Sequence, residues 1–253
     1  MTNCSSSKKT NTRALSFAPN QVVAHRGAFK KNHVPENSIA SLKEAVRLGC
    51  TGSEFDVHFT ADDSLVVAHD NTHFGKTIAA TSYATLIKDR LTNGEKLPTA
   101  REYLLEGMKQ NKTMLVYELK PSVVSKERGQ IAAQKTVELV KELNAQPWVM
   151  YISFDYDMLK KILELDPKAK TAYLNGEKPP AEVKKDGIWG IDYNHRVFQN
   201  NPEWIQEAKD NNITLNVWTV NKAEDMQWYI DHKFDYITTD EPELLFELLT
   251  KPK

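Results

Sequence analysis

Short apolar runs alternate with helical patterns along almost the whole of this 253-residue sequence. Eight runs have the length and composition of buried strands, and each is followed, directly or after an insertion, by a segment with the apolar period of a helix. The predicted strands are residues 21–24, 52–60, 113–121, 148–153, 169–174, 188–193, 214–220 and 236–239. The predicted helices are residues 39–48, 99–111, 127–143, 157–165, 181–185, 202–211, 222–232 and 241–249. Because alternating strands and helices form parallel sheets, and eight such units close on themselves, we predict a (β/α)8 TIM barrel.

An open, doubly wound sheet is the alternative arrangement of the same elements. No glycine-rich dinucleotide loop follows a predicted strand, which favours the closed barrel. The usual length of a TIM barrel fits residues 21–253, so we predict that they form a single domain. Residues 71–98 match neither pattern well, apart from a short helix at 83–91, and we interpret them as an insertion over the strand ends. Residues 1–20 are polar and rich in Ser, Thr and Lys, which predicts a disordered tail.

The overall composition excludes several classes of function. Hydrophobic residues make up 40% of the chain and charged residues 26%, the balance of a globular protein with a large core. The net charge is −1 and no stripe of basic residues is present, so the sequence gives no indication of nucleic-acid binding. No apolar run has the length of a transmembrane segment. The two cysteines, Cys4 and Cys50, are too few for a disulfide framework or a zinc site.

The start of the chain gives a weak indication of location. Cys4 is followed by Ser-Ser-Ser-Lys-Lys, which resembles the beginning of a mature bacterial lipoprotein from which the signal has been removed. The alternative is a polar tail without function. We therefore slightly favour a periplasmic or lipid-anchored envelope protein over a cytoplasmic one.

The second predicted strand carries two acids with one residue between them. Side chains alternate across a strand, so Glu54 and Asp56 lie on one face and Phe55 on the other. Neighbouring carboxylates raise each other's pKa, and a divalent cation such as Mg²⁺ or Ca²⁺ is a common remedy. The chain then turns at 61–64 and returns to His69, which predicts an imidazole beside a metal site.

Other polar residues also fall at the carboxyl ends of predicted strands, where the active sites of TIM barrels are built. The full set is His25, Glu54, Asp56, Glu118, Lys120, Trp218 and Asp240. Taken alone, each has a simpler explanation: the Glu54/Asp56 pair as a solvated strand face, the Glu118/Lys120 pair as a surface ion pair, Trp218 as barrel core. Their joint occurrence at strand ends favours a catalytic site.

Several short motifs occur in a fixed order along the chain. They are His25-Arg26-Gly27, Pro35-Glu36-Asn37-Ser38, Glu54-x-Asp56-Val57 with Thr60 and Asp62, His69-Asp70, Glu118-Leu119-Lys120, Val217-Trp218-Thr219-Val220-Asn221 and Thr238-Thr239-Asp240-x-Pro242. Each motif alone is a weak signal. The ordered set, which spans about residues 22–242, resembles the glycerophosphodiester phosphodiesterases.

This resemblance implies a TIM barrel with a small insertion after the second strand, which residues 71–98 match. It implies hydrolysis of a small-molecule glycerophosphodiester to an alcohol and glycerol 3-phosphate, with one divalent cation, Ca²⁺ or Mg²⁺. The residue roles that it implies are metal binding by Glu54, Asp56 and Glu118, acid/base catalysis by His25 and His69, and phosphate binding by Arg26 and Lys120. We further expect the Trp218 side chain to line the pocket that receives the alcohol head group.

Two alternatives stay open at the level of the sequence. The first is a lysophospholipase D or sphingomyelinase-D-like enzyme on the same scaffold, which a long apolar lip around the site would favour. The second is a metal-dependent binder of phosphodiester head groups, against which the intact pair His25 and His69 argues. We expect His25 to act as base and His69 as acid, and the nucleophile is either water or a neighbouring glycerol hydroxyl.

Overall fold

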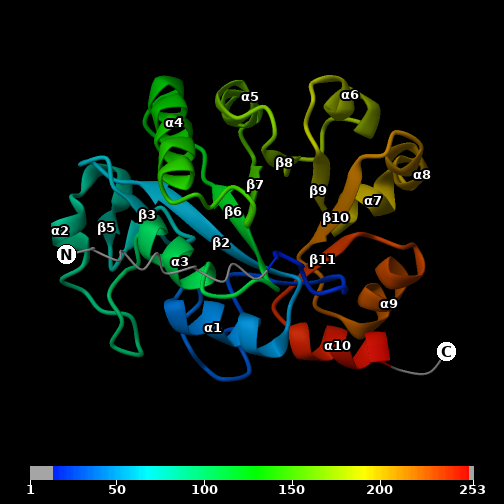
Figure 1. Cartoon of the computed structure of the whole chain (residues 1–253), viewed down its shortest axis with the longest axis horizontal. Helices are drawn as coiled ribbons and strands as arrows, with labels where there is room; N and C mark the ends of the chain where they lie inside the picture. Colours follow the sequence, from blue (N-terminus) through cyan, green and yellow to red (C-terminus); the bar gives the residue numbers. More distant parts are fainter. Residues whose placement is uncertain (1–13, 251–253) are drawn as a thin grey trace, which may run out of the picture.

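Eight parallel strands form a closed barrel in the structure, a computed structural model that describes residues 14–250 (Figure 1). The barrel strands are β1 (Val22–Ala24), β2 (Gly52–Phe59), β6 (Met114–Leu119), β7 (Val149–Ser153), β8 (Lys170–Tyr173), β9 (Gly190–Asn194), β10 (Thr214–Trp218) and β11 (Tyr236–Thr239). Each strand pairs in parallel with the next in this order, and β11 pairs back with β1. The closure confirms the predicted (β/α)8 TIM barrel and excludes the open sheet.

Helices surround the barrel, as Figure 1 shows. They are α1 (Ile39–Leu48), α3 (Ala100–Gly107), α4 (Lys126–Glu142), α5 (Tyr156–Leu165), α6 (Pro180–Lys185), α7 (His195–Asn200), α8 (Glu203–Asp210), α9 (Ala223–Asp231) and α10 (Pro242–Thr250). The sequence did not predict α7, which begins directly after the last residue of β9, so no loop signal separates the two elements. Its start is fixed instead by the side chain of Asn194, which accepts a hydrogen bond from the Arg196 backbone N–H.

Alternation along β2 decides which side chains enter the barrel. Phe55 and Val57 face outward into the core beneath the helices, where the Phe55 ring stacks on Tyr103 of α3 at 4.2 Å between centroids. Glu54 and Asp56 consequently face the barrel interior. A slip of one residue would bury the two acids among the helices, so the apolar face fixes the register that places the acids inside.

A hairpin after β2 leads into the insertion. β3 (Leu65–Val67) pairs antiparallel with the end of β2, and the Ala68 N–H donates to the Asp56 carbonyl at 3.0 Å. The insertion contains β4 (Thr72–His73), β5 (Lys76–Thr77), a 3-10 turn (Ile78–Ala80) and α2 (Tyr83–Leu86), which ends earlier than predicted. A small apolar core of Val66, Ile78, Leu86 and Leu97 holds the insertion on the hairpin.

The predicted boundary of the disordered tail at residue 20 is wrong for the part of the tail that the structure describes. The Ser16 and Ala18 N–H groups donate to Asn111 and Lys112 at 3.0 and 2.7 Å, and the Phe17 ring packs against the interior cluster at the amino end of the barrel. The apolar pair Phe17-Ala18 explains this docking. Cys4 lies outside the described residues, so the envelope location stays a prediction. Within residues 14–250, no helix is long and apolar enough to cross a bilayer.

Gly27 shapes the loop after β1, where the first polar motif lies. Its φ of 77° is in the left-handed region, and a Cβ there would lie 2.6 Å from the backbone carbonyl carbon of Ser41 at the start of α1. The loop and helix are locked further by the Ser41 hydroxyl, which donates to the Arg26 carbonyl at 3.0 Å. Only glycine fits this close approach.

We therefore expect Gly27→Ala to lower the free energy of unfolding by about 2–4 kcal/mol, the sum of a left-handed backbone penalty and an overpacking cost. Gly49→Ala is the matched control, because Gly49 has a φ of 79° but no atom within 4 Å of an added Cβ. The control should lose only about 1–2 kcal/mol. Urea unfolding of both variants measures the difference, and equal losses would contradict the proposed clash.

Candidate active site

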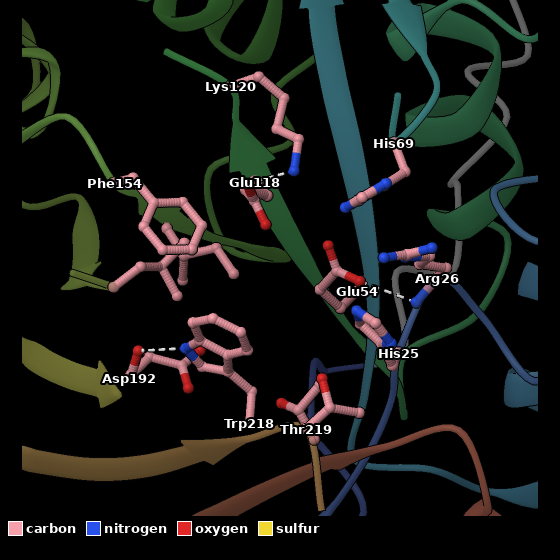
Figure 2. A pocket seen from close by; sticks show the side chains of 13 residues that line it. His25, Arg26, Glu54, His69, Glu118, Lys120, Phe154, Asp192, Trp218 and Thr219 are labelled. Atoms are coloured by element: carbon pink, nitrogen blue, oxygen red, sulfur yellow. Dashed lines mark hydrogen bonds and ion pairs between the residues drawn. The ribbon is translucent and has the colours of Figure 1, made fainter. Parts of the chain in front are cut away.

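A cavity of about 230 Å³ opens at the carboxyl ends of the barrel strands (Figure 2). It is lined by His25, Arg26, Glu54, His69, Glu118, Lys120, Ile152, Phe154, Leu174, Asp192, Trp218, Thr219 and Thr238. Seven of the eight site residues predicted from the sequence are in this lining, and the eighth, Asp56, lies beside Glu54 and Glu118. The structure thus brings the whole predicted set together, while the roles of its members stay predictions.

Three carboxylates form the acidic side of the site. Glu54 and Asp56 come from β2 and Glu118 from β6, where Glu118 is the register partner of Asp56. One oxygen of each lies within 4.8 Å of the others, and all three side chains are buried. Glu54 Oε1 has no hydrogen-bond partner among the described residues, although its Oε2 accepts the Arg26 N–H at 2.7 Å. The barrel therefore buries three like charges with incomplete compensation.

The pKa values of the three acids reflect this crowding. Burial raises the pKa of Glu54 well above its usual value, and the charges of Asp56 and Glu118 raise it further. Burial and then the Asp56 charge raise the pKa of Glu118 to about 7. Burial alone would raise the pKa of Asp56 too, but Lys120 and a hydrogen bond from Asn37 lower it below its usual value.

Lys120 lies among these acids. Its Nζ is 2.8 Å from Asp56 Oδ1 and 2.7 Å from Glu118 Oε1, and Figure 2 shows the side chain reaching toward Glu118. Burial would lower the pKa of Lys120, but the two carboxylates raise it, so the ammonium stays charged. Its predicted contact with phosphate stays a prediction, because the structure pairs it with the two acids.

Arg26 is held by the loop between β1 and α1. Its φ of 54° is unusual for a residue with a side chain, and such strain is common at functional sites. The guanidinium Nη1 donates to both carboxylate oxygens of Glu36 at 2.9 and 3.0 Å, and Nε lies 3.7 Å from Asp56 Oδ2. The next motif residue, Asn37, donates to Asp56 Oδ2 at 2.8 Å and accepts from the Asp56 N–H at 3.0 Å. Glu36 and Asn37 thus position Arg26 and Asp56, a role that the sequence did not reveal.

Each predicted catalytic histidine contacts a carboxylate through Nδ1. His25 lies 2.7 Å from Asp240 Oδ1, and His69 lies 2.8 Å from Asp70 Oδ1. Burial would raise the pKa of Asp240, but hydrogen bonds from His25 and Asn221 lower it. Because an ionised carboxylate only accepts, Asp240 keeps the His25 proton on Nδ1 and leaves Nε2 free to exchange one. Asp240 was noted at a strand end, but its pairing with His25 spans 215 positions and has no local signal.

The other side of the cavity is largely apolar. Trp218 lines it, with its Nε1 donating to the Asp192 carbonyl at 2.8 Å and its ring edge-to-face with Phe154. The ring also packs on the interior core, and its expected contact with the alcohol head group stays a prediction. Asp192 was missed by the sequence analysis, although a charged residue in the middle of an apolar strand is a visible signal.

A divalent cation fits the acidic side of this cavity. Three carboxylates from two adjacent strands present hard oxygen donors, which suit Mg²⁺ or Ca²⁺. Without its cation, such a ligand set is expected to leave an oxygen without a partner and to raise the pKa values of its acids. Both features are present here: Glu54 Oε1 has no hydrogen-bond partner among the described residues, and the pKa values of Glu54 and Glu118 are raised.

The chain is similar to known proteins over most of its length. The model of the Glycerophosphoryl diester phosphodiesterase family matches residues 25–244. A glycerophosphodiester phosphodiesterase of Caldanaerobacter subterraneus subsp. tengcongensis is 31% identical over 250 residues, covering 91% of this chain and 98% of that one.

Solved structures give the same result. A crystal structure of a glycerophosphodiester phosphodiesterase from Parabacteroides distasonis superposes with a TM-score of 0.88 and 43% identity, covering 92% of this chain and 98% of that one. One from Thermotoga maritima superposes with a TM-score of 0.73 and 26% identity, covering 90% and 97%.

The burial of Glu54 predicts that Glu54→Gln changes the free energy of unfolding in opposite directions without and with a divalent cation. A raised folded-state pKa means that the stability this acid provides is present below its unfolded pKa and is lost as the pH rises. In EDTA at pH 8, Glu54→Gln should therefore raise the free energy of unfolding by about 1–3 kcal/mol, the usual cost of a buried group without its full set of partners. The difference should vanish near the unfolded pKa, 4.5.

Adding Ca²⁺ or Mg²⁺ should reverse the order of stability. Wild type should gain about 2.7 kcal/mol at a cation concentration of one hundred times Kd, whereas the variant should gain less. Glu138→Gln, an exposed substitution on α4, is the control and should behave as wild type in both conditions. A Glu54→Gln protein that is less stable than wild type in EDTA at pH 8 would contradict this account of the acidic site.

Proposed function

The chain belongs to the glycerophosphoryl diester phosphodiesterase family and is a phosphoric diester hydrolase, and on this premise we propose that it hydrolyses glycerophosphodiesters with the help of one divalent cation. The products are an alcohol and glycerol 3-phosphate. The observation that carries the proposal is the convergence of three buried carboxylates, two cationic side chains and two histidines on one small cavity.

The charges of the site suit a phosphodiester. Glu54, Asp56 and Glu118 would hold the cation, and together with it they leave a charge of about −1. Arg26 and Lys120 bring these groups to roughly +1, and the Glu36 carboxylate bound to Arg26 offsets part of that charge. Both cationic side chains suit the single negative charge of a phosphodiester. When bound, the cation would supply Lewis-acid polarisation of the phosphoryl oxygen and would orient a hydroxyl group or a water.

The two histidines divide the proton transfers. His25, with Nδ1 bound to Asp240, has a free Nε2 that accepts the proton of the attacking oxygen. His69 donates a proton to the alcohol oxygen as its bond to phosphorus breaks, so the alcohol leaves uncharged. If the nucleophile is the neighbouring glycerol hydroxyl, a cyclic phosphate forms, and a water then opens it with the same two histidines in exchanged roles.

The dimensions of the cavity favour a short alcohol. Its volume of about 230 Å³ lies below the roughly 300–1,000 Å³ of typical pockets for drug-sized ligands. A lysophospholipid is the second candidate substrate, because Phe74 of the insertion and Val123 and Val124 after β6 are exposed apolar side chains that a long chain could contact. Turnover of lysophosphatidylcholine would identify that activity.

The test of the proposed function is the release of glycerol 3-phosphate from glycerophosphocholine, glycerophosphoethanolamine and glycerophosphoglycerol. Each reaction is run after EDTA treatment and again with Ca²⁺ or Mg²⁺ restored. Release that depends on the cation is expected. Full release in EDTA would contradict the role of the cation, and binding without release would make the protein a head-group binder.

Removal of either proposed acid/base residue should abolish most turnover. We expect His25→Ala and His69→Ala to lower kcat by about 10²–10⁴-fold, the usual contribution of general acid/base catalysis. Stabilisation by the cation should persist in both variants, because neither histidine belongs to the acidic triad. His232→Ala, at the end of α9 and outside the cavity lining, is the control. Normal kcat in either variant would remove that histidine from the chemistry.

A further inference from the structure

The side of the cavity formed by β7, β8, β9 and β10 has no role in the chemistry described so far. Figure 2 shows Phe154, Trp218 and Asp192 together on this side, across the cavity from His25, Arg26 and His69. All the basic side chains of the lining lie on the other side, on or after β1, β2 and β6. The cavity therefore has a basic, metal-binding side and a side that carries an acid between apolar groups.

Asp192 is a buried acid without a counterion. Its side chain is 2% exposed, and its Oδ1 has no hydrogen-bond partner among the described residues. None of the ion pairs found within residues 14–250 includes it, and its register partner on β10 is the neutral Asn216. A buried carboxyl group normally has a partner, so this one has unused capacity for a cation or a donor.

Two aromatic rings stand beside this acid. The indole N–H of Trp218 donates to the Asp192 backbone carbonyl at 2.8 Å, which fixes the ring next to the carboxyl group. Phe154 contacts Trp218 edge-to-face at 5.5 Å between centroids, so the two rings form a corner. Aromatic faces attract cations, most strongly ammonium groups that have lost water. A carboxyl group and two rings are complementary to an organic cation.

We propose that Asp192, Trp218 and Phe154 form a subsite for the ammonium group of a zwitterionic glycerophosphodiester, an ethanolamine or choline ester. The inference rests on the proposed function and specifies its substrate class. The phosphate of such a substrate would lie at the basic side of the cavity and the ammonium group at Asp192, so both of its charges meet complementary groups. A neutral glycerol head group could donate a hydrogen bond to Asp192 but would supply no positive charge.

The raised pKa of Asp192 is the expected result of burying this carboxyl group without a positive charge beside it. Burial, and then the charge of Glu118, raise the pKa of Asp192 to about 8. An ammonium group would supply the missing positive charge and stabilise the carboxylate form. The subsite thus adds a specificity residue, not a second acid or base, to the reaction.

The test compares kcat/KM for a cationic and a neutral head group in wild type and Asp192→Asn, which keeps the shape and removes the charge. Glycerophosphocholine, glycerophosphoethanolamine and glycerophosphoglycerol are the probes, with the 3,3-dimethylbutyl ester as the uncharged isostere of the choline ester. The ratio of kcat/KM for the ethanolamine ester over its neutral counterpart should fall about 10- to 100-fold in Asp192→Asn, the range for losing a hydrogen bond to a charged group. The ratio for the choline ester should fall less, because its quaternary nitrogen has no N–H and interacts with Asp192 through charge alone.

Two further variants complete the experiment. Asp210→Asn removes the same charge from an exposed position on α8 and should leave the ratio unchanged. Phe154→Leu keeps apolar volume and removes the ring, and should lower the ratio of choline ester to dimethylbutyl ester about two- to fivefold. This variant keeps the inference testable if Asp192→Asn does not fold.

The outcomes separate the two proposals. Selective loss for the cationic esters supports the ammonium subsite. Equal loss for all esters, or no change in the ratio, overturns it, even though turnover of the esters by wild type would still support the phosphodiesterase function. Absence of glycerophosphodiester turnover in wild type would instead overturn the proposed function, and with it this inference.

Discussion

Three carboxylates buried within reach of one another impose the strictest requirement on this structure. Little of their surface is exposed to water, and their mutual repulsion is stronger there than at the surface of the protein. The chain meets part of this requirement with its own groups: the Lys120 ammonium, the Asn37 amide and the Arg26 backbone N–H. These groups leave Glu54 Oε1 without a hydrogen-bond partner among the described residues, and a divalent cation is the partner that we propose for it.

The need to compensate these buried charges explains the unusual backbone conformations of Arg26 and Gly27. Arg26 adopts a left-handed backbone conformation because its N–H must reach Glu54 while its carbonyl binds the Ser41 hydroxyl and the Asn37 N–H. Gly27 must then pass against α1 without a Cβ. The strained loop, the start of the first helix and the acids on β2 form one unit, in which stability is traded for a site that binds and reacts.

The sequence was sufficient for the parts of this account that depend on local periodicity. The period of two along β2 placed Glu54 and Asp56 on one face, and eight strand–helix units indicated the closed barrel.

The sequence was insufficient where the cause is an interaction between distant positions. His25 meets Asp240 only because β11 closes on β1, and the ion pair between Lys120 and Asp56 depends on the register between β2 and β6. Asp192 could have been found, because an acid inside an apolar strand requires an explanation. Helix α7 begins directly after β9 without a loop signal, and the docking of residues 14–20 depends on Phe17 packing at the amino end of the barrel.

We infer that a divalent cation completes the acidic triad, and locating the ion in a crystal would test this inference. Crystals grown with Mn²⁺ would be measured for anomalous scattering. The account predicts one ion per chain with oxygens of Glu54, Asp56 and Glu118 among its ligands, at about 2.0–2.6 Å, the range for hard divalent cations. Lys120 Nζ should then have moved away from at least one of its two carboxylates. An ion bound elsewhere, or no ion at saturating Mn²⁺ with Lys120 still between Asp56 and Glu118, would contradict the account.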